Sequence, residues 1–350
     1  GIKYKPLLCS NLTTAGFDQL GEALSKKAAF FLKVDSENQL ALSWWVSPKR
    51  TRSYPYGRVY DTLQFSGKKV TVIPIVKDEG KQGDRDFVQW DTISLMSLLG
   101  VYVIIGYYSG ASRSTRYKHK ITAQRFDLEH LSGEIDELMC YQSSALHWNI
   151  AQIERIGSIG EKALRAYTDM SKQLNVEMHS LKSAQRRIDV LLEDKAKFMT
   201  LSRDLAKKAQ VRESVTTQPK EQLTGIKGTL TIKNYLGGCY YWTCDEIELH
   251  SNQIFLIEAK HTRKDELPSL GDIKDALLKM MLFTNLENLR VGEKGYLPIP
   301  IVKLTTGPDL NLQAQSSQKK NMLIHLREEA ETNGFRVSIN GEYLTLKTLA

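Results

Sequence analysis

The 350-residue sequence has few cysteines, and their spacing excludes two classes of protein. Only Cys9, Cys140, Cys239 and Cys244 are present, and no pair has the CxxC spacing of a zinc site. A disulfide framework is not indicated either, so reduced thiols in a cytoplasm fit best. The seven histidines are scattered without metal-ligand spacing, and ordinary surface or core positions are expected for them.

Long apolar runs are also missing. No stretch approaches the roughly 18 residues that a membrane-spanning helix needs, and residues 1–30 lack a signal-peptide pattern. We therefore expect a cytoplasmic protein with no membrane partner. Lys and Arg number 48 against 40 Asp and Glu, which gives a net charge of +8 and a pI near 9.1. This excess of positive charge favours a polyanionic partner.

The pattern of residues divides the chain into three regions. Residues 1–125 indicate a mixed α/β domain, residues 126–215 a helical region, and residues 216–350 a second α/β domain. In the helical region apolar residues recur at spacings of three, four and seven, which is typical of helices packed on their neighbours. The fold class predicted is therefore α/β with an added helical middle region.

The first region contains a strand–helix–strand pattern. The segments "KKVTVIPIV" (68–76) and "VYVIIGYY" (101–108) are rich in β-branched and aromatic residues, as buried strands are. Between them, "WDTISLMSLLG" (90–100) has helical spacing and ends in Gly100. This order predicts a βαβ unit, and hence a parallel pair of strands.

The stretch "IFLIEAKHT" (254–262) places charge on a strand that is otherwise apolar. Side chains alternate along a strand, so Glu258 and Lys260 point to one face. The segment "HSN" (250–252) predicts a hairpin turn, which folds Asp245 back beside Glu258. Three charged groups then meet at one place. The plain alternative is a strand that runs out into solvent with an ion pair on one face.

Two carboxylates beside a lysine suit metal-assisted hydrolysis. Carboxylate and carbonyl oxygens are the ligands that Mg²⁺ prefers, with water completing its octahedron. Water bound to a metal is acidified and becomes a nucleophile, and a neighbouring ammonium group orients it or neutralises developing charge. The sequence therefore predicts Asp245 and Glu258 as metal ligands and Lys260 as a catalytic residue.

The pattern D-x12-E-A-K on a hairpin resembles the PD-(D/E)xK nuclease superfamily. A helix over 267–286, with a capping box at Ser269 and Asp272, and a strand over 296–304 follow in the superfamily's order. Type II restriction endonucleases contain segments similar to "TGIKGTLTIKNY…WTCDEIEL…IEAKHT…LPSLGDIKDALLKM" of this sequence. The resemblance covers about residues 216–310, and Cys244 stands where the family has Pro.

This resemblance implies a prokaryotic, Mg²⁺-dependent type II site-specific deoxyribonuclease that cuts double-stranded DNA. Two chains are the simplest way to cut two strands with one site each, so a homodimer is expected. A structure-specific repair or junction-resolving nuclease, a non-catalytic DNA-binding protein and a purely structural protein remain open. Family cores add an upstream carboxylate, for which the sequence offers four candidates: Glu161, Glu177, Glu213 and Glu221. Lys274 or Lys279 could reach the site from the following helix, although an exposed face of that helix is expected for both.

Two basic segments are candidates for DNA contact. The first, residues 43–58, mixes cations with Trp and Tyr, and the second, residues 109–120, is a Ser-rich loop. Cations bind phosphates and aromatic rings stack on bases, although ordinary charged loops have the same composition. The predicted DNA-binding residues are Lys49, Arg50, Arg52, Arg58, Arg113, Arg116 and Lys118.

Residues 60–80 and 244–264 share an order of features. Each begins with an Asp, turns at small polar residues, enters an apolar strand and ends near a Lys. Ile75 takes the place of Glu258, so a metal is not expected in the first copy. We therefore consider residues 40–110 as a degenerate copy of the nuclease core. The alternative is that any two βαβ units share this order.

Overall fold

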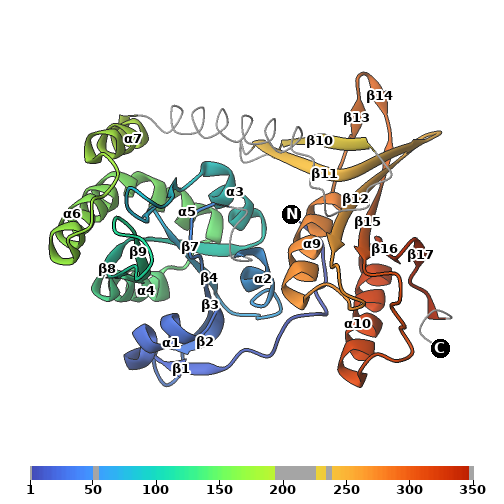
Figure 1. Ribbon diagram of the computed structural model, residues 1–350, viewed down its shortest axis with the longest axis horizontal. Coiled ribbons are helices and arrows are strands. Elements are labelled where there is room, and N and C mark those ends of the chain that lie inside the picture. The colour runs from blue at the N-terminus through green and yellow to red at the C-terminus, as the bar shows by residue number, and fades with distance from the viewer. Residues whose placement is uncertain (1, 50–54, 194–225, 234–238, 347–350) are drawn as a thin grey trace. The chain divides into compact units, whose positions relative to one another are not determined.

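The computed structural model describes residues 2–49, 55–193, 226–233 and 239–346. Contacts group these residues into two compact units. The N-terminal unit contains residues 11–49 and 55–193, and the C-terminal unit contains residues 2–10, 226–233 and 239–346. Both combine helices with a sheet (Figure 1), which confirms the α/β class. The helices between residues 128 and 193 are grouped with the N-terminal sheet.

The N-terminal unit is built on a five-stranded sheet in the order β1-β2-β3-β4-β7. β2 and β3 are antiparallel, whereas β3, β4 and β7 are parallel. The predicted βαβ unit is confirmed, because α3 connects the parallel strands β4 and β7. The strands are β1 (Thr14–Gly16), β2 (Ala29–Lys33), β3 (Gln39–Trp44), β4 (Lys69–Pro74) and β7 (Val101–Gly106). The helices are α1 (Leu20–Lys26), α2 (Pro55–Tyr60), α3 (Trp90–Leu98), α4 (Leu128–Cys140), α5 (Ala145–Glu154), α6 (Ile156–Leu174) and α7 (Leu181–Glu193).

Side chains of α5 cover the edge of β7. The Asn149 Oδ1 atom accepts from the Val103 N–H at 2.7 Å, and the Asn149 amide donates to the Val101 carbonyl at 3.0 Å. The Trp148 indole donates to the Val103 carbonyl at 2.8 Å. An uncovered edge strand offers unpaired backbone groups to other chains. The helix therefore satisfies this edge of the sheet with side chains instead of another strand.

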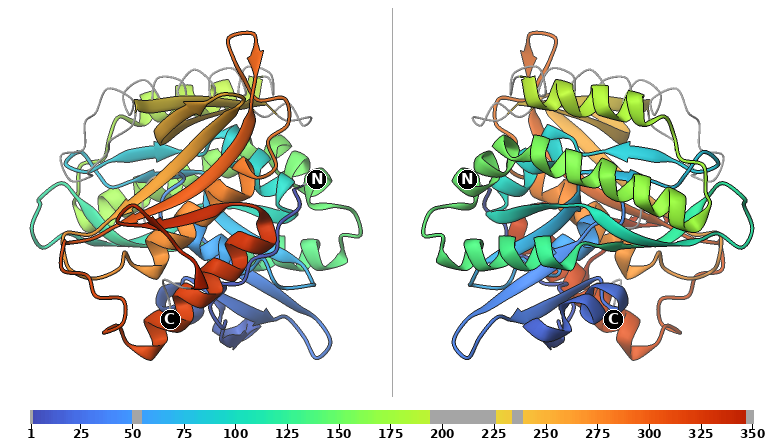
Figure 2. Two further views of the ribbon diagram at one scale, coloured as in Figure 1. Left: turned by 90° about the vertical axis from the view of Figure 1, so that its right-hand side faces the viewer. Right: turned by 90° about the vertical axis from the view of Figure 1, so that its left-hand side faces the viewer.

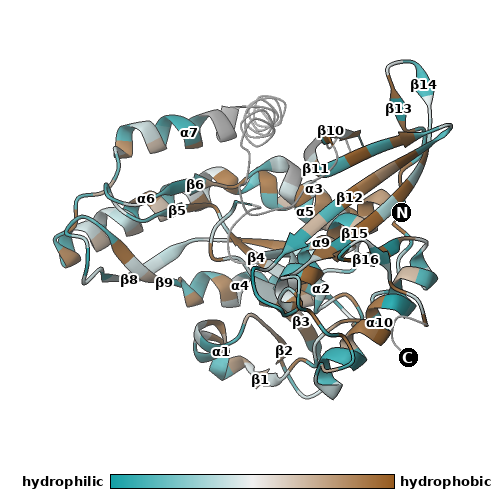
Figure 3. Ribbon diagram, turned by 45° about the vertical axis from the view of Figure 1, so that its right-hand side comes forward, coloured by the Kyte–Doolittle hydropathy of each residue, from teal (hydrophilic) through white to brown (hydrophobic). Residues whose placement is uncertain are grey.

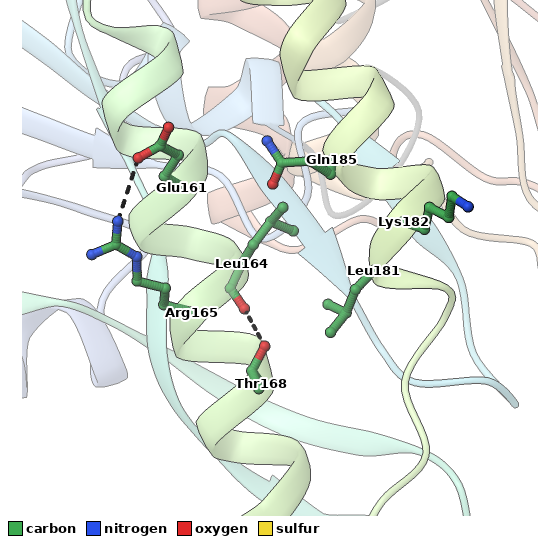
Figure 4. A pocket seen from close by; sticks show the side chains of 7 residues that line it. All are labelled: Glu161, Leu164, Arg165, Thr168, Leu181, Lys182 and Gln185. Carbon is green, nitrogen blue, oxygen red and sulfur yellow. Dashed lines mark hydrogen bonds and ion pairs between the residues drawn. The ribbon is translucent and has the colours of Figure 1, made fainter.

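Helices α6 and α7 pack side by side (Figure 2, right). Leu164, Ala184 and Ile188 form their apolar contact, and a Cβ atom on Gly160 would lie only 2.7 Å from the Ile188 side chain. The close approach thus needs glycine, and the predicted helical packing is confirmed here. A hollow of about 510 Å³ lies between the two helices, and Figure 4 shows the side chains that line it. Its lining residues are Glu161, Leu164, Arg165, Thr168, Leu181, Lys182 and Gln185.

Two small hairpins complete the N-terminal unit: β5 (Val76–Asp78) with β6 (Arg85–Phe87), and β8 (Tyr108–Arg113) with β9 (Ile121–Phe126). The prediction of a loop over residues 109–120 was wrong for residues 109–113. The backbone there pairs with β9, and only the tip of the hairpin is a turn.

The C-terminal unit has a six-stranded sheet in the order β10-β11-β12-β15-β16-β17. β10, β11 and β12 are antiparallel, and β12, β15 and β16 are parallel. The predicted order of hairpin, strand, helix and strand is confirmed, and Figure 3 shows the hydrophobic residues along β12 and β15. The strands are β10 (Ile226–Lys233), β11 (Cys239–His250), β12 (Gln253–His261), β13 (Arg290–Val291), β14 (Lys294–Gly295), β15 (Leu297–Thr305), β16 (Arg336–Ile339) and β17 (Glu342–Tyr343). The helices are α9 (Leu270–Phe283) and α10 (Ser317–Asn333).

Two local features predicted for this unit, a helix cap and a tight turn, are confirmed. The Ser269 hydroxyl caps α9 by accepting from the Asp272 N–H at 3.2 Å. Asn340 and Gly341 both have positive φ, +50° and +92°, in the turn between β16 and β17. A two-residue type I′ turn requires this conformation at both positions.

Residues 2–10 complete the C-terminal unit from the far end of the sequence. Glu329 of α10 is fully buried, and its carboxylate accepts from the Tyr4 hydroxyl at 2.6 Å and from the Leu7 N–H at 2.8 Å. Lys274 of α9 donates to the Ser10 hydroxyl at 2.6 Å. The segment therefore supplies the hydrogen bonds that a buried carboxylate needs.

The predicted hairpin over residues 60–80 was wrong. Residues 55–60 form α2, and Asp61 lies in the turn that follows it. In strand direction, β2 and β3, which precede residues 60–80 in the chain, correspond to β11 and β12. β2 and β3 are antiparallel and are followed by parallel β4 and β7, just as β11 and β12 are followed by β15 and β16. Near its end, β3 carries Ser43 and Trp44, so it lacks the Glu and Lys of β12.

The ion pairs of Glu79 should make the N-terminal unit sensitive to acid. Burial raises the pKa of Glu79, but its bonds to Lys77 (2.6 Å) and Lys120 (2.9 Å) outweigh this and lower the pKa from 4.5 to about 2. This contribution to stability is complete above pH 4.5 and is lost as the pH falls towards 2. We expect Glu79→Gln to lower the free energy of unfolding at pH 7, and we expect its difference from wild type to shrink below pH 4.5.

Urea unfolding between pH 7 and pH 2.5 measures this difference, with the exposed Glu37→Gln as the matched control. A deficit of Glu79→Gln that stays constant across this range would contradict the prediction.

Candidate metal-dependent active site

The β11–β12 hairpin brings the predicted residues together. The strands pair from His250↔Gln253 to Glu246↔Ile257, through a turn in which Ser251 has φ +54°. One residue beyond this register, Asp245 lies opposite Glu258. Directly opposed residues of an antiparallel pair point to the same face, as do Glu258 and Lys260 along β12.

Asp245 stands where the two strands separate. Their ladder ends at Glu246, and the Asp245 Oδ2 atom accepts from the Ala259 N–H at 2.8 Å. A side-chain oxygen therefore takes the place of a backbone acceptor. This bond holds the carboxylate against β12, next to Glu258.

The Glu258 carboxylate is nearly fully buried, at 2% exposure, and each of its oxygens accepts from a lysine. The Lys260 Nζ atom lies 2.9 Å from Oε1, and the Lys279 Nζ atom of α9 lies 2.5 Å from Oε2. Burial raises the pKa of Glu258, but the attraction of Lys260 and Lys279 outweighs it and lowers the pKa to about 2. The carboxylate is thus ionised at neutral pH.

The two lysines are held in the charged state by the same contacts. Burial lowers the pKa of Lys260, but Glu258 outweighs it and the net pKa is raised. Burial likewise lowers the pKa of Lys279, and Glu258 and Asp245 together raise it well above its ordinary value. Two carboxylates and two ammonium groups therefore form one compact site of opposed charges. Buried charges persist only when paired in this way.

The prediction of an exposed position for Lys274 and Lys279 was wrong. Lys274 is 3% exposed, and the Lys279 Nζ atom donates to Glu258 and to the Thr243 carbonyl at 3.3 Å. The composition of α9 contains the missed signal. Its residues 273–283 are apolar on nearly every side, and such a helix is buried all round. Lysines within it must then find buried partners.

A second buried ion pair lies on the opposite face of the sheet. The Lys303 Nζ atom is 2.6 Å from Oε1 of Glu246, which is fully buried. Glu246 follows Asp245 on β11, so their side chains point to opposite faces. Neither Glu246 nor Lys303 is among the site residues predicted from the sequence. This pair provides a structural counterpart to the site, with the same residue types in the same sheet.

The donor set at the site fits Mg²⁺. Asp245 and Glu258 offer carboxylate oxygens from adjacent strands, and Mg²⁺ usually keeps several waters beside one or two carboxylates. No cluster of three or more His, Cys, Asp or Glu suited to a metal occurs within the described residues. The ammonium group of Lys279 supplies the positive charge next to Oε2.

Two of the four candidate upstream carboxylates lie among the described residues. Glu161 and Glu177 belong to the N-terminal unit, where they pair with Arg165 at 3.4 Å and Lys81 at 2.6 Å. Glu213 and Glu221 lie outside the described residues.

The predicted DNA-binding residues fall into three groups. Lys49 pairs with the buried Asp86, and Arg58 donates to the Trp44 carbonyl at 2.8 Å with its guanidinium over the Trp44 ring. These two side chains are thus engaged within the N-terminal unit. The other described candidates, Arg113, Arg116 and Lys118, lie on the β8–β9 hairpin. Arg50 and Arg52 lie outside the described residues.

No protein-family model, curated protein or solved structure matches the chain. Among the described helices, none combines the length and the apolar character needed to cross a membrane. Function is therefore inferred from the side chains of the β11–β12 hairpin and α9.

Removing the ammonium group of Lys279 should lower the stability of the protein, because it leaves the buried Glu258 carboxylate less well paired. We expect Lys279→Met to lower the free energy of unfolding by about 1–3 kcal/mol, because Glu258 then keeps only one ammonium partner. The double variant Lys279→Met/Glu258→Gln should lose less free energy of unfolding than the sum of the losses of the two single variants, since the residues are in direct contact. Urea unfolding followed by circular dichroism measures both effects.

The exposed Lys264→Met is the matched control, with an expected change within about 0.5 kcal/mol. Strict additivity of the two site substitutions would contradict the ion pair.

Proposed function

We propose that the protein is a Mg²⁺-dependent endonuclease of the PD-(D/E)xK type that hydrolyses phosphodiester bonds of double-stranded DNA at a specific sequence. The observation that carries the proposal is the convergence of Asp245, Glu258 and Lys260 on one face at the end of the β11–β12 hairpin. The order of hairpin, α9 and parallel β15 around this face supports it. Cutting both strands is simplest with two copies of the chain.

The residues take separate roles in this reaction. Asp245 and Glu258 would hold the metal, which when bound supplies an acidified water and stabilises negative charge on the scissile phosphate. Lys260 lies within hydrogen-bonding distance of Glu258 and orients the attacking water or neutralises charge as it develops. Lys279 positions the Glu258 carboxylate from α9.

Cleavage of a long supercoiled plasmid in MgCl₂ tests the chemistry, and sequencing of the ends tests the specificity. We expect discrete fragments from wild type and none in EDTA. Asp245→Asn, Glu258→Gln and Lys260→Ala should each lower the cleavage rate at least about 100-fold. The two carboxylate variants should bind DNA as tightly as wild type or more tightly, because they remove negative charge that faces phosphates.

Lys303→Met is the matched control for stability. It breaks the other buried Glu–Lys pair of the sheet and should leave cleavage intact. Cleavage that persists both in EDTA and in Asp245→Asn would overturn the metal-nuclease proposal. Preference for branched over fully paired DNA would assign the same chemistry to a structure-specific nuclease.

The tip of the β8–β9 hairpin is the part of the N-terminal unit where we expect phosphate contact. Arg113→Ala, Arg116→Ala and Lys118→Ala should each weaken binding to all DNA sequences alike. A plot of the logarithm of the DNA association constant against the logarithm of the salt concentration has a negative slope. Each substitution should also make this slope less steep by about one. If one of these residues instead binds the edge of a guanine, its substitution should cost about 1–3 kcal/mol of binding free energy, and only for DNA with that base pair.

Fluorescence anisotropy at several salt concentrations makes this measurement, with Lys162→Ala on the exposed face of α6 as the charge-matched control. Unchanged affinity in all three variants would place the phosphate contacts elsewhere.

A further inference from the structure

A cavity of about 630 Å³ is lined entirely by residues of the N-terminal unit. Its lining residues come from the carboxyl end of β3, from the segments that follow β4 and β7, and from α1, β9 and the start of α4. Figure 1 shows where these elements lie in the N-terminal unit. Trp44 ends β3, Lys77 follows β4 by three residues, and Tyr108 follows β7 by two. The carboxyl ends of parallel strands are where open α/β sheets bind ligands.

Most of the cavity wall is apolar and aromatic. The rings of Tyr108 and Phe126 lie 4.5 Å apart between centroids, and the Trp44 ring meets Phe126 edge-on at 6.0 Å. Leu24, Val46 and Ile121 continue this wall. Tyr108 is held by a hydrogen bond from its hydroxyl to the Val46 carbonyl at 2.9 Å. An apolar wall of this kind suits a flat, aromatic ligand.

One part of the cavity lining is cationic. Lys77, Lys120 and Arg125 line it together with a single carboxylate, that of Glu79. Glu79 binds both lysines and thereby fixes their ammonium groups beside the apolar wall. Three positive groups against one negative group leave a net positive charge that favours an anionic ligand.

The backbone at the cavity is also strained. Ala123 lines the cavity with φ +47°, a left-handed conformation that is unfavourable for a non-glycine residue. It lies at the irregular part of the β8–β9 pairing. Strained residues of this kind concentrate at ligand sites, where the surrounding structure imposes their conformation.

We propose that this cavity binds a nucleotide, with its base against Trp44, Tyr108 and Phe126 and its phosphate at Lys77, Lys120 and Arg125. The size of the cavity lies within the range of about 300–1,000 Å³ found for small-molecule sites. The nucleotide is either a free mononucleotide or an unpaired nucleotide of DNA turned out of the helix, because both present a base and a phosphate. This inference goes beyond the proposed cleavage reaction and requires no metal.

Calorimetric titration of the full chain with the four deoxynucleoside monophosphates tests the site directly. At least one of them should bind more tightly than its nucleoside and more tightly than inorganic phosphate. Lys120→Ala should weaken nucleotide binding at least about tenfold and leave nucleoside binding nearly unchanged. Ser25→Trp, an exposed position of α1 on the cavity wall, should fill the cavity and abolish binding of both. Lys162→Ala, outside the cavity, should bind as wild type does.

A second titration distinguishes the two sources of the nucleotide. A DNA duplex with one unpaired 2-aminopurine should bind more tightly than the fully paired duplex if the nucleotide comes from DNA. That difference should vanish in Ser25→Trp. Binding of mononucleotides without this preference would identify a free nucleotide as the ligand.

The proposal is overturned if neither probe binds, or if Ser25→Trp and Lys120→Ala bind both as wild type does. Neither titration involves cleavage or Mg²⁺, so failure here leaves the nuclease proposal untouched. Loss of cleavage activity in the hairpin variants likewise says nothing about this cavity.

Discussion

The ionised carboxylate of Glu258, almost fully buried, is the constraint on which the C-terminal unit depends. A buried charge costs several kcal/mol unless it is paired and hydrogen-bonded. Here one partner, Lys260, comes from the same strand, and the other, Lys279, comes from α9. This second contact links the position of the helix to the sheet. The Asp245 carboxylate adds to the arrangement by taking the N–H of Ala259 where the two strands separate.

The two units share a series of strand directions but carry different side chains on them. Each has an antiparallel pair followed by two parallel strands. In the C-terminal unit the pair carries opposed charges on one face. In the N-terminal unit, Ser43 and Thr71 form a buried hydrogen bond of 2.9 Å instead, and residues at or after the carboxyl ends of the strands line the aromatic cavity. Fold topology alone therefore does not decide which site a sheet carries.

Predictions from local pattern succeeded where a few neighbouring residues decide the structure. The cap at Ser269, the turn at Asn340 and Gly341, and the βαβ unit over 68–108 are of this kind. Predictions failed where distant contacts decide it. Asp61 follows a helix and begins no strand, and the Ser-rich segment after Tyr108 extends a strand, because β9 lies beside it to accept its hydrogen bonds. A polar composition does not reveal such a partner.

The sequence by itself determined that Glu258 and Lys260 share a face, because strand side chains alternate with a period of two. It also determined the turn at residues 250–252 that returns Asp245 to that face. Only the tertiary structure decided that Lys279 completes the charge balance, and that residues 2–10 satisfy Glu329 more than 300 positions away. Both are contacts between groups far apart in the chain. Burial forces each charged group to find a partner, but packing alone selects which one.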